Sequence, residues 1–267
     1  MKRAFVGRPI AFVLAATDHG SMIVNRNDHR METPTAGIGV GFQLLNRSSF
    51  DPSEVGLALE VLAQRRRDFG DGVVALDCGA NIGVQTIEWA RAMHGWGEVV
   101  AIEAQERLFY ALAGNIALNN CLNARALHAA VGATNGAIHV PVPDYNRPGS
   151  FGSLEIRRDA SSEFIGQPLD DGPAAAANTR LLAIDSLNLA RCDFMKIDVE
   201  GMEIEALDGA ARTLERCRPA LLVEAIKSDA AALGARLTSR GYKLFQVAIN
   251  ILAIHVSDPV LERFKKP

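Results

Sequence analysis

The sequence has no closely spaced pair of cysteines. Its four cysteines are scattered along 267 residues, at Cys78, Cys121, Cys192 and Cys217. Structural zinc sites typically use Cys-x-x-Cys pairs, and disulfide frameworks belong to short, cysteine-rich secreted chains. We therefore predict neither a zinc site nor disulfide bonds, and we expect reduced thiols in a cytoplasmic protein.

Long apolar runs are missing as well. Met1–Arg3 place positive charge before an apolar stretch, as a signal peptide does, but Arg8 and Pro9 interrupt that stretch. The uninterrupted part, Ile10–Ala16, has only seven residues, whereas a helix that crosses a bilayer needs about 20. We predict no transmembrane segment and interpret Ile10–Ala16 as a β-strand.

An excess of positive charge is the third absence. The chain carries 28 Lys and Arg against 31 Asp and Glu, a net charge of -3, and its pI is about 6.1. Proteins that bind the nucleic-acid backbone usually carry basic patches, so no nucleic-acid partner is predicted. Apolar residues make up 48% of the chain, which is typical of a globular protein with a large core. No internal repeat is present, and no pattern indicates an oligomeric state.

From residue 71 onward, apolar runs alternate with helical patterns. The runs predict strands at Val73–Leu76, Glu98–Ile102, Arg125–Val131, Phe194–Ile197 and Ala220–Glu224. Between and after them, helical patterns occur at Val84–Met93, Glu106–Asn119, Glu203–Arg216 and Asp229–Arg240. Further short strands are expected at Ala137–Val142 and Arg180–Ile184. This order predicts an α/β fold with a doubly wound, Rossmann-like and mostly parallel sheet.

The last two strands break the parallel pattern. Only three residues separate Lys243–Val247 from Ile251–Val256, which is too few for a crossover helix, so these strands must pair antiparallel. A mostly parallel sheet that ends in an antiparallel hairpin is typical of class I methyltransferases rather than of dinucleotide dehydrogenases.

The first 70 residues precede this alternation. They contain a predicted hairpin, Ile10–Ala16 with Ser21–Val24 around a polar turn, and a helix that begins at Asp51 and ends near Arg67. We therefore divide the chain into an N-terminal extension, residues 1–70, which would help to cover the acceptor site, and a main domain, residues 71–267.

Acidic side chains follow the predicted strands. Open parallel sheets bind ligands at the carboxyl ends of their strands, and there the sequence places Asp77, Glu103, Asp198, Glu200 and Glu224. Such a rim repels a pyrophosphate but suits a ligand with a sulfonium, an ammonium and a ribose diol. The rim therefore predicts S-adenosylmethionine as cofactor, with S-adenosylhomocysteine as its product.

The loop after the first strand reads D-x-G-x-N-x-G rather than the G-x-G-x-x-G of dinucleotide-binding proteins. This difference makes a nicotinamide-dependent oxidoreductase the less favoured alternative. Glycines in the loop allow the backbone to approach the cofactor, and Glu103 is placed to accept hydrogen bonds from both ribose hydroxyls. The predicted cofactor-binding residues are Asp77, Gly79, Asn81, Gly83, Glu103, Ala104, Ala130 and Asp198.

Several segments together resemble the FkbM-type methyltransferases. They are Asp77–Gly83, Ile102–Ala104, Gly114–Asn120, Ala183–Leu187, Met195–Glu203, Val223–Glu224 and Asn250–Ala253. The most specific of them contains K-I-D-V-E-G-x-E, and the matching region extends from Val73 to His255. The resemblance implies methylation that depends on S-adenosylmethionine, commonly of a hydroxyl group on a sugar or polyketide product.

Methyl transfer to oxygen requires an aligned hydroxyl group and a group that accepts its proton. Asp198 and Glu200 are the predicted catalytic residues: one would hold the methionine ammonium or the acceptor, and the other would act as base, in an order left open. The plainer alternative is that one of them caps the helix that follows. Among the histidines, His19 and His29 lie in polar turns from which they could also reach an acceptor.

Other functions remain as alternatives. A non-catalytic module that binds S-adenosylmethionine would need the same rim, although the long loop Pro143–Thr179 favours a closed catalytic pocket. The segment after the fourth strand lacks the Asn/Asp-Pro-Pro-aromatic loop that grips a flipped base, so methylation of nucleic-acid amines is not predicted. The acceptor that the resemblance implies is a small molecule or a glycan. A magnesium site at Asp198, Glu200 and Glu224 is chemically possible, but bare carboxylates are poor evidence for a metal, and none is predicted.

Overall fold

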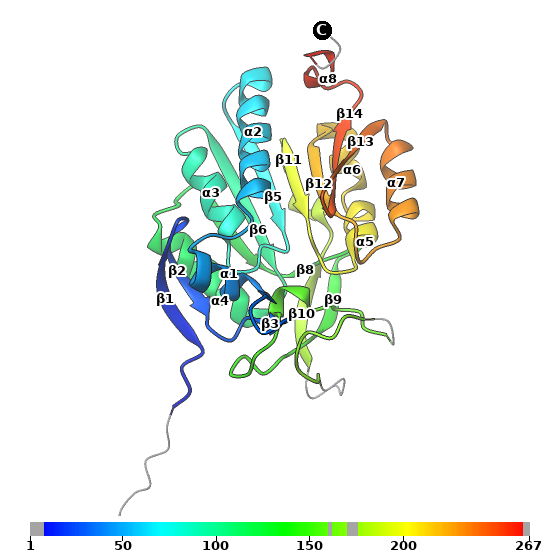
Figure 1. The fold of residues 1–267 in the computed structure, drawn as a ribbon. Coiled ribbons are helices and arrows are strands. Elements are labelled where there is room, and N and C mark those ends of the chain that lie inside the picture. Colours follow the sequence, from blue (N-terminus) through cyan, green and yellow to red (C-terminus); the bar gives the residue numbers. More distant parts are fainter. Residues whose placement is uncertain (1–7, 160–161, 170–175, 264–267) are drawn as a thin grey trace, which may run out of the picture.

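A seven-stranded sheet forms the centre of the molecule (Figure 1). The structure is a computed structural model and describes residues 8–159, 162–169 and 176–263. The strand order is β13-β14-β12-β11-β5-β6-β7. In chain order, the strands are β5 (Val73–Cys78), β6 (Gly97–Glu103), β7 (Ala124–His128), β11 (Phe194–Ile197), β12 (Ala220–Glu224), β13 (Tyr242–Val247) and β14 (Asn250–His255). The five neighbouring strands β12, β11, β5, β6 and β7 are parallel, and β14 pairs antiparallel with β12 and with β13. This arrangement confirms the predicted fold class.

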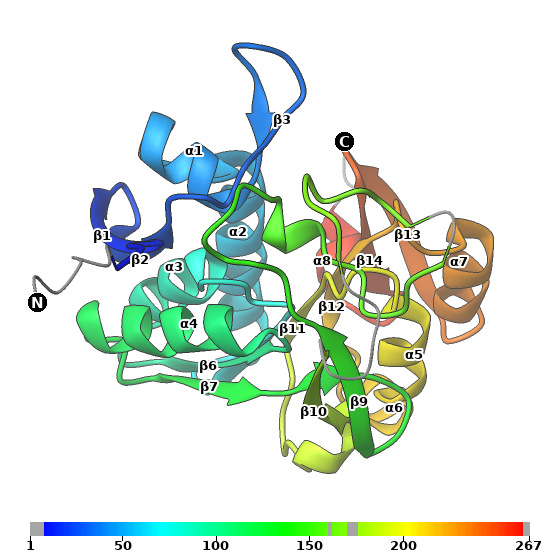
Figure 2. The same ribbon diagram turned by 90° about the horizontal axis from the view of Figure 1, so that it is seen from below.

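Helices cover both faces of this sheet (Figure 2). One face carries α2 (Pro52–Phe69), α3 (Val84–Ala92) and α4 (Glu106–Leu118), and the other carries α5 (Glu203–Asp208), α6 (Ala211–Cys217) and α7 (Ala230–Thr238). A short helix, α8 (Val260–Arg263), ends the described chain. Within the described residues, no helix combines the length and apolar character that a membrane crossing needs.

Alternating side chains of β5 fill the two cores. Val73 and Ala75 belong to the core under α2 and α3, whereas Leu76 and Cys78 belong to the core under α5 to α7, as the two-residue repeat of a strand dictates. A strand that is buried on both faces reads as a continuous apolar run. This is why the sequence identified the central strands.

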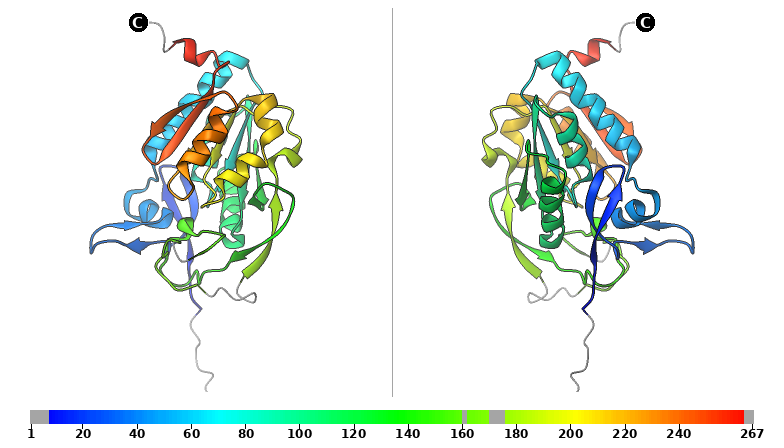
Figure 3. Two further views of the ribbon diagram at one scale, coloured as in Figure 1. Left: turned by 90° about the vertical axis from the view of Figure 1, so that its right-hand side faces the viewer. Right: turned by 90° about the vertical axis from the view of Figure 1, so that its left-hand side faces the viewer.

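The N-terminal segment packs beside the carboxyl ends of the sheet strands (Figure 3). The predicted hairpin is confirmed as β1 (Phe12–Thr17) and β2 (Gly20–Asn25), and β2 packs on α4. Two short strands, β3 (Arg30–Met31) and β4 (Gly37–Ile38), follow, and then helix α1 (Val40–Arg47). The sequence did not predict these three elements, because two-residue strands and an eight-residue helix carry too little periodicity. Whether residues 1–70 act as a separate unit stays a prediction.

The predicted strand Arg125–Val131 is wrong in its extent. It divides into β7 and β8 (Ala130–Val131), and β8 joins β9 (Gly136–Pro141) and β10 (Ala176–Leu182) in a second sheet of order β8-β10-β9. Strand β6 ends at Glu103, whose carbonyl accepts the last hydrogen bond, from the amide of Ala129. Beyond that point β6 offers no partner, so the chain pairs with β10 instead.

The single helix predicted at Glu203–Arg216 is also wrong, because it breaks into α5 and α6. A Cβ on Gly209 would lie 2.0 Å from the carbonyl oxygen of Gly132, so the backbone at the break packs directly on another segment. The next helix, α6, is capped at its N-terminus by the side chain of Asp185, which lies in a 3-10 turn at Ile184–Leu187. Its carboxylate accepts hydrogen bonds from the amides of Arg212 and Thr213 at 2.9 and 2.8 Å.

Candidate active site

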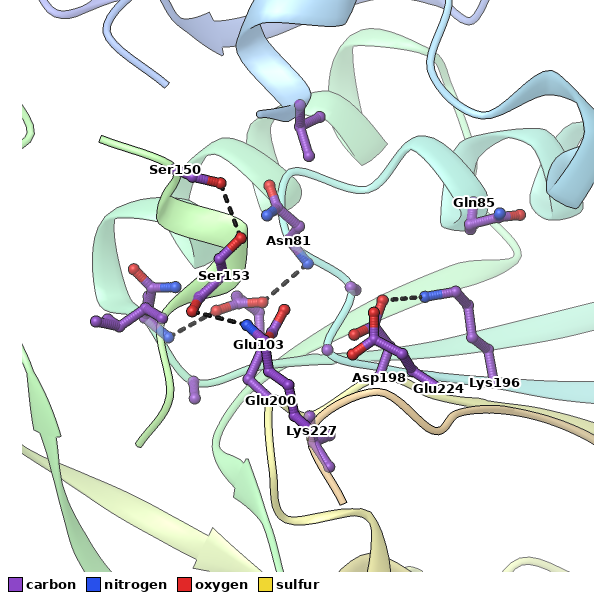
Figure 4. Close-up of a pocket in the computed structure, with 18 of the residues that line it drawn as sticks. Asn81, Gln85, Glu103, Ser150, Ser153, Lys196, Asp198, Glu200, Glu224 and Lys227 are labelled. Atoms are coloured by element: carbon purple, nitrogen blue, oxygen red, sulfur yellow. Dashed lines mark hydrogen bonds and ion pairs between the residues drawn. The ribbon is translucent and has the colours of Figure 1, made fainter. Parts of the chain in front are cut away.

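A cavity of about 400 Å³ lies at the carboxyl ends of β5, β6, β11 and β12 (Figure 4). The sheet forms its floor, and its other walls come from the N-terminal segment, from residues 150–156 and from Glu163. The structure brings all but one of the predicted site residues to this cavity, namely Asp77, Gly79, Asn81, Glu103, Ala104, Ala130, Asp198 and Glu200. The exception is Gly83, which lies behind the cavity wall at the N-terminus of α3.

The two loop glycines are required first of all by the protein's own packing. Gly79 has a φ of +84°, and a Cβ there would lie 1.7 Å from the carbonyl oxygen of Asp198. Gly83 has a φ of +93°, and a Cβ there would lie 2.6 Å from Leu112 of α4. The loop therefore packs closely between α4 and the residue that follows β11. The predicted contacts of both glycines with the cofactor stay predictions.

Replacing Gly79 by alanine should destabilise the protein more than replacing Gly95. Both glycines have positive φ, so alanine costs each about 1–2 kcal/mol in backbone strain. A Cβ on Gly95 meets nothing within 4 Å, whereas one on Gly79 forces β5 and β11 apart, at a further cost of about 1–3 kcal/mol. Urea unfolding of both variants measures the difference. Equal losses would show that the loop tolerates the displacement.

Glu103 is fixed at the end of β6 by the glycine loop. Its side chain is 5% exposed, and its two oxygens accept hydrogen bonds from the amides of Asn81 at 2.8 Å and Gln105 at 2.7 Å. Burial raises its pKa to about 7, although these hydrogen bonds favour the charged form. Each carboxylate oxygen can accept a second hydrogen bond. Glu103 is therefore held in place at the cavity with acceptor capacity to spare.

Three carboxylates lie close together in the lining of the cavity. Asp198, Glu200 and Glu224 each offer an oxygen, and these oxygens lie within 4.8 Å of one another. Burial and the charge of Asp198 raise the pKa of Glu224 to about 8, and the same two causes raise the pKa of Glu200 well above its usual range. The sequence placed Glu224 on the acidic rim but did not include it among the predicted site residues.

Two lysines that the sequence analysis did not single out hold this cluster. Lys196 is 6% exposed, and its Nζ lies 2.6 Å from Asp198 Oδ2 and 3.7 Å from Glu54. Lys227 forms an ion pair with Glu200 and donates a hydrogen bond to the carbonyl of Ser153 at 3.0 Å. Lys196 opens the K-I-D motif, which was a usable signal, whereas nothing around Lys227 in the sequence indicated its role.

The side chain of Glu203 stabilises the turn that carries Asp198 and Glu200. Glu203 is fully buried and accepts hydrogen bonds from the amides of Val199 and Gly201, both at 3.1 Å. The N-cap residue of α5 is Met202, and no side chain caps it. The alternative in which Asp198 or Glu200 merely caps this helix is therefore wrong, since Glu203 holds the turn and both acids contact lysines at the cavity.

The N-terminal segment is joined to the site by two acids, the partly buried Glu54 and the buried Asp28. Glu54 of α2 accepts hydrogen bonds from Gln85 at 2.9 Å and from Asn250 at 2.7 Å. Asp28 accepts hydrogen bonds from the amides of Gly41 and Phe151, both at 2.9 Å. These long-range contacts make residues 28–54 part of the cavity wall.

Asp28 should make the protein less stable as the pH rises. Burial, its largest cause, raises its pKa from 3.8 to about 6, so the folded chain binds this proton more tightly than the unfolded chain. Stability therefore falls between those two pKa values, by about 1 kcal/mol per pH unit near pH 5. Asp28→Asn should lose this slope in urea unfolding at a series of pH values. An unchanged slope would contradict the assignment, provided that circular dichroism shows a folded variant.

The histidine alternatives find no support in the cavity lining. His19, which the sequence places in a polar turn, is only 4% exposed. Its Nδ1 lies 2.9 Å from Glu88, and its Nε2 accepts a hydrogen bond from the amide of Phe50. Neither His19 nor His29 lines the cavity. His19 therefore stabilises the N-terminal segment, and the turn prediction missed its burial because the partners are distant in sequence.

Solved structures with similar folds include methyltransferases of low sequence identity. An FkbM methyltransferase from Methylobacillus flagellatus KT is 20% identical, with a TM-score of 0.48 and coverage of 69% of this chain and 44% of that chain. A putative caffeoyl-CoA O-methyltransferase from Staphylococcus aureus is 11% identical, with a TM-score of 0.49 and coverage of 80% and 88%. The chain thus spans under half the length of the first protein, and similarities of this size carry no argument about activity.

The family comparison is decisive. Curated proteins give no significant match, but the model of the methyltransferase FkbM domain matches residues 77–244, more than half of the chain. The matched region contains the glycine loop, Glu103 and the whole carboxylate cluster. The match confirms the predicted methyltransferase and its cofactor, S-adenosylmethionine. The chain belongs to the FkbM methyltransferase family.

Proposed function

We propose that this methyltransferase transfers a methyl group to a hydroxyl oxygen of a small molecule or glycan. The observation that carries the proposal is the cluster of Asp198, Glu200 and Glu224, whose side chains line the same cavity as Glu103. A hydroxyl group must lose its proton to become a methyl ether, and carboxylates of raised pKa are suitable acceptors for that proton.

Glu103, Ala104 and Ala130 would hold the nucleoside part of S-adenosylmethionine. The fixed carboxylate of Glu103 would accept hydrogen bonds from the ribose hydroxyls, and the two small alanines border the adjoining space. When bound, the cofactor supplies an electrophilic methyl group. The acidic surroundings suit its positive charge, since the acids at the cavity outnumber its lysines.

Asp198 and Glu200 would orient the acceptor and take its proton. Asp198 keeps one oxygen on Lys196, and Glu200 keeps one on Lys227, so both side chains have defined positions. Ordered groups of this kind lower the barrier by removing motions that would otherwise be lost in the reaction. Glu200 is the better base of the two, because burial and Asp198 raise its pKa.

The outer walls of the cavity support a hydroxylated acceptor. Arg30 forms an ion pair with Glu163 at 2.7 Å, which joins the N-terminal segment to the loop that contains Ser150 and Ser153. These groups can donate and accept hydrogen bonds with sugar hydroxyls. Glu163 and its acidic neighbours would repel phosphates, which supports the prediction of no nucleic-acid partner.

Glu103→Ala should weaken the binding of S-adenosylhomocysteine by about 10-fold or more, the scale of a lost charge-assisted hydrogen bond. Calorimetric titration of the wild type and the variant measures this effect. An analogue that lacks the ribose 2′-hydroxyl separates a direct contact from loop disorder: it should bind more weakly than S-adenosylhomocysteine to the wild type, but equally to the variant. Equal affinity of wild type and variant for S-adenosylhomocysteine would remove Glu103 from the site.

The acceptor class is tested by methyl transfer from labelled S-adenosylmethionine to a panel of hydroxylated sugars and small glycans. Release of S-adenosylhomocysteine together with a labelled methyl ether supports the proposal. Binding of S-adenosylhomocysteine without turnover on the whole panel would favour the non-catalytic binding module, and methylation of amines alone would contradict hydroxyl chemistry.

A further inference from the structure

Two of the three cluster carboxylates each contain a buried oxygen without a hydrogen-bond partner among the described residues. Asp198 Oδ1 and Glu224 Oε2 are buried, and neither has a hydrogen-bond partner among the described residues. The whole Glu224 side chain is only 8% exposed and lies at the cavity, at the end of β12. A buried acceptor without a partner costs about 1–3 kcal/mol. Such groups indicate a positively charged ligand between them.

The two lysines do not neutralise this cluster. Lys196 lies between Asp198 and Glu54, and Lys227 lies between Glu200 and Glu163, which is 3.2 Å away. Each lysine therefore serves one acid of the cluster and one acid outside it. Together with Arg30, which also pairs with Glu163, three positive charges face five carboxylates, so the cluster retains a negative excess.

The lysines also leave the cluster oxygens available. Lys196 contacts Asp198 through Oδ2, and Lys227 contacts Glu200 through Oε2. The second oxygen of each acid, and both oxygens of Glu224, have no hydrogen bond from a lysine. Parallel strands β11 and β12 bring these acids to one edge, as Figure 4 shows for Asp198 and Glu224.

We propose that Asp198, Glu200 and Glu224 bind one divalent, oxygen-preferring cation such as Mg²⁺ or Mn²⁺. All donors are carboxylate oxygens, which suit these ions rather than Zn²⁺ or Cu²⁺. Opposite ligands of an octahedral ion with bonds of about 2.1 Å lie about 4.2 Å apart. Oxygens within 4.8 Å of one another reach that geometry by small side-chain rotations, and water completes the shell. This inference departs from the sequence analysis, which predicted no metal.

The role of the ion rests on the proposed methyl transfer to oxygen. The acceptor hydroxyl replaces a water on the ion, which lowers the pKa of the hydroxyl. Its proton passes to the oxygen of Glu200 that does not contact the ion, in keeping with the role of Glu200 as base. The oxygen then forms a bond to the methyl carbon while the carbon–sulfur bond breaks and sulfur keeps the electron pair. The products are a methyl ether and S-adenosylhomocysteine.

Titration of the full chain with Mn²⁺, followed by the electron paramagnetic resonance of the unbound ion, tests the site without any acceptor. The wild type should bind one Mn²⁺ per chain. Glu224→Gln removes a charged ligand at nearly constant shape and should weaken binding by about 10-fold or more. Glu98→Gln, on an exposed position of β6, should bind as the wild type does. Thermal unfolding shows whether each variant is folded.

The absence of saturable Mn²⁺ binding by the wild type, or equal affinity in Glu224→Gln, would overturn the cation site. Calorimetry with S-adenosylhomocysteine on the same samples separates the two proposals. If the protein binds S-adenosylhomocysteine but does not bind Mn²⁺, only the cation site is overturned. Binding of Mn²⁺ without S-adenosylhomocysteine would support the cation site and contradict the proposed methyl transfer.

Discussion

Glu200→Gln is expected to lower kcat by about 100-fold or more, while the Kd for S-adenosylhomocysteine changes by less than about 3-fold, because a positioned general base contributes 10²- to 10⁴-fold to a rate. Glutamine keeps the shape of the side chain and a contact for Lys227, but it cannot take up the hydroxyl proton. The measurement is initial-rate kinetics with the acceptor that the sugar panel identifies, together with calorimetry of S-adenosylhomocysteine.

The conservative variant Glu200→Asp is the control for this result. It retains a carboxylate with a shorter reach, so it should recover part of the lost kcat and keep a pH-dependent rate, whereas Glu200→Gln should not. The opposite division, with kcat unchanged and the affinity for S-adenosylhomocysteine reduced, would assign Glu200 to cofactor binding and leave Asp198 as the base.

Lys196→Met is expected to destabilise the folded protein by about 3–5 kcal/mol at neutral pH, the usual cost of removing one partner of a buried ion pair. Lys196 is 6% exposed and faces Asp198 and Glu54, with Asp77 nearby. Burial opposes its charge, but these acids raise its pKa above the ordinary value. Methionine would leave these partly buried acids without their counter-charge.

Urea unfolding at several pH values measures this effect. Acids that have lost their partner bind protons more tightly in the folded than in the unfolded chain, so the deficit of Lys196→Met should shrink as the pH falls toward about 5. Lys243→Met is the matched control, because Lys243 is exposed on β13, and it should change stability by less than about 0.5 kcal/mol. Similar midpoints for the two variants would show that the acids do not depend on Lys196.

The sequence predicted the central sheet because its strands are buried on both faces. Apolar runs such as Val73–Leu76 and Ala220–Val223 contain no polar residue, which distinguishes them from loops. The short link after Val247 required an antiparallel final pair. The wrong predictions concern segments whose structure depends on contacts with residues that are distant in the sequence. The strand after Arg125 changes sheets because β6 ends, and the helix after Glu203 breaks because Gly209 packs on Gly132.

The site, too, has features that the local sequence predicts and features that depend on distant contacts. Asp77, Glu103, Asp198 and Glu200 could be predicted because each follows a strand, and parallel strands deliver their carboxyl ends to one edge. That rule depends only on the order of elements along the chain. It says nothing about the distance between two side chains at the edge.

By itself, then, the sequence determined the fold, the family and the acidic rim, since these follow from local periodicity and from the spacing of motifs. Only the tertiary structure decided the charge balance of the site. Lys227 meets Glu200 across 27 residues, and Glu54 meets Asn250 across 196. Such contacts depend on how helices and loops pack over the sheet. They fix which carboxylates pair with a lysine, and within the described residues they leave Oε2 of Glu224 without a hydrogen-bond partner.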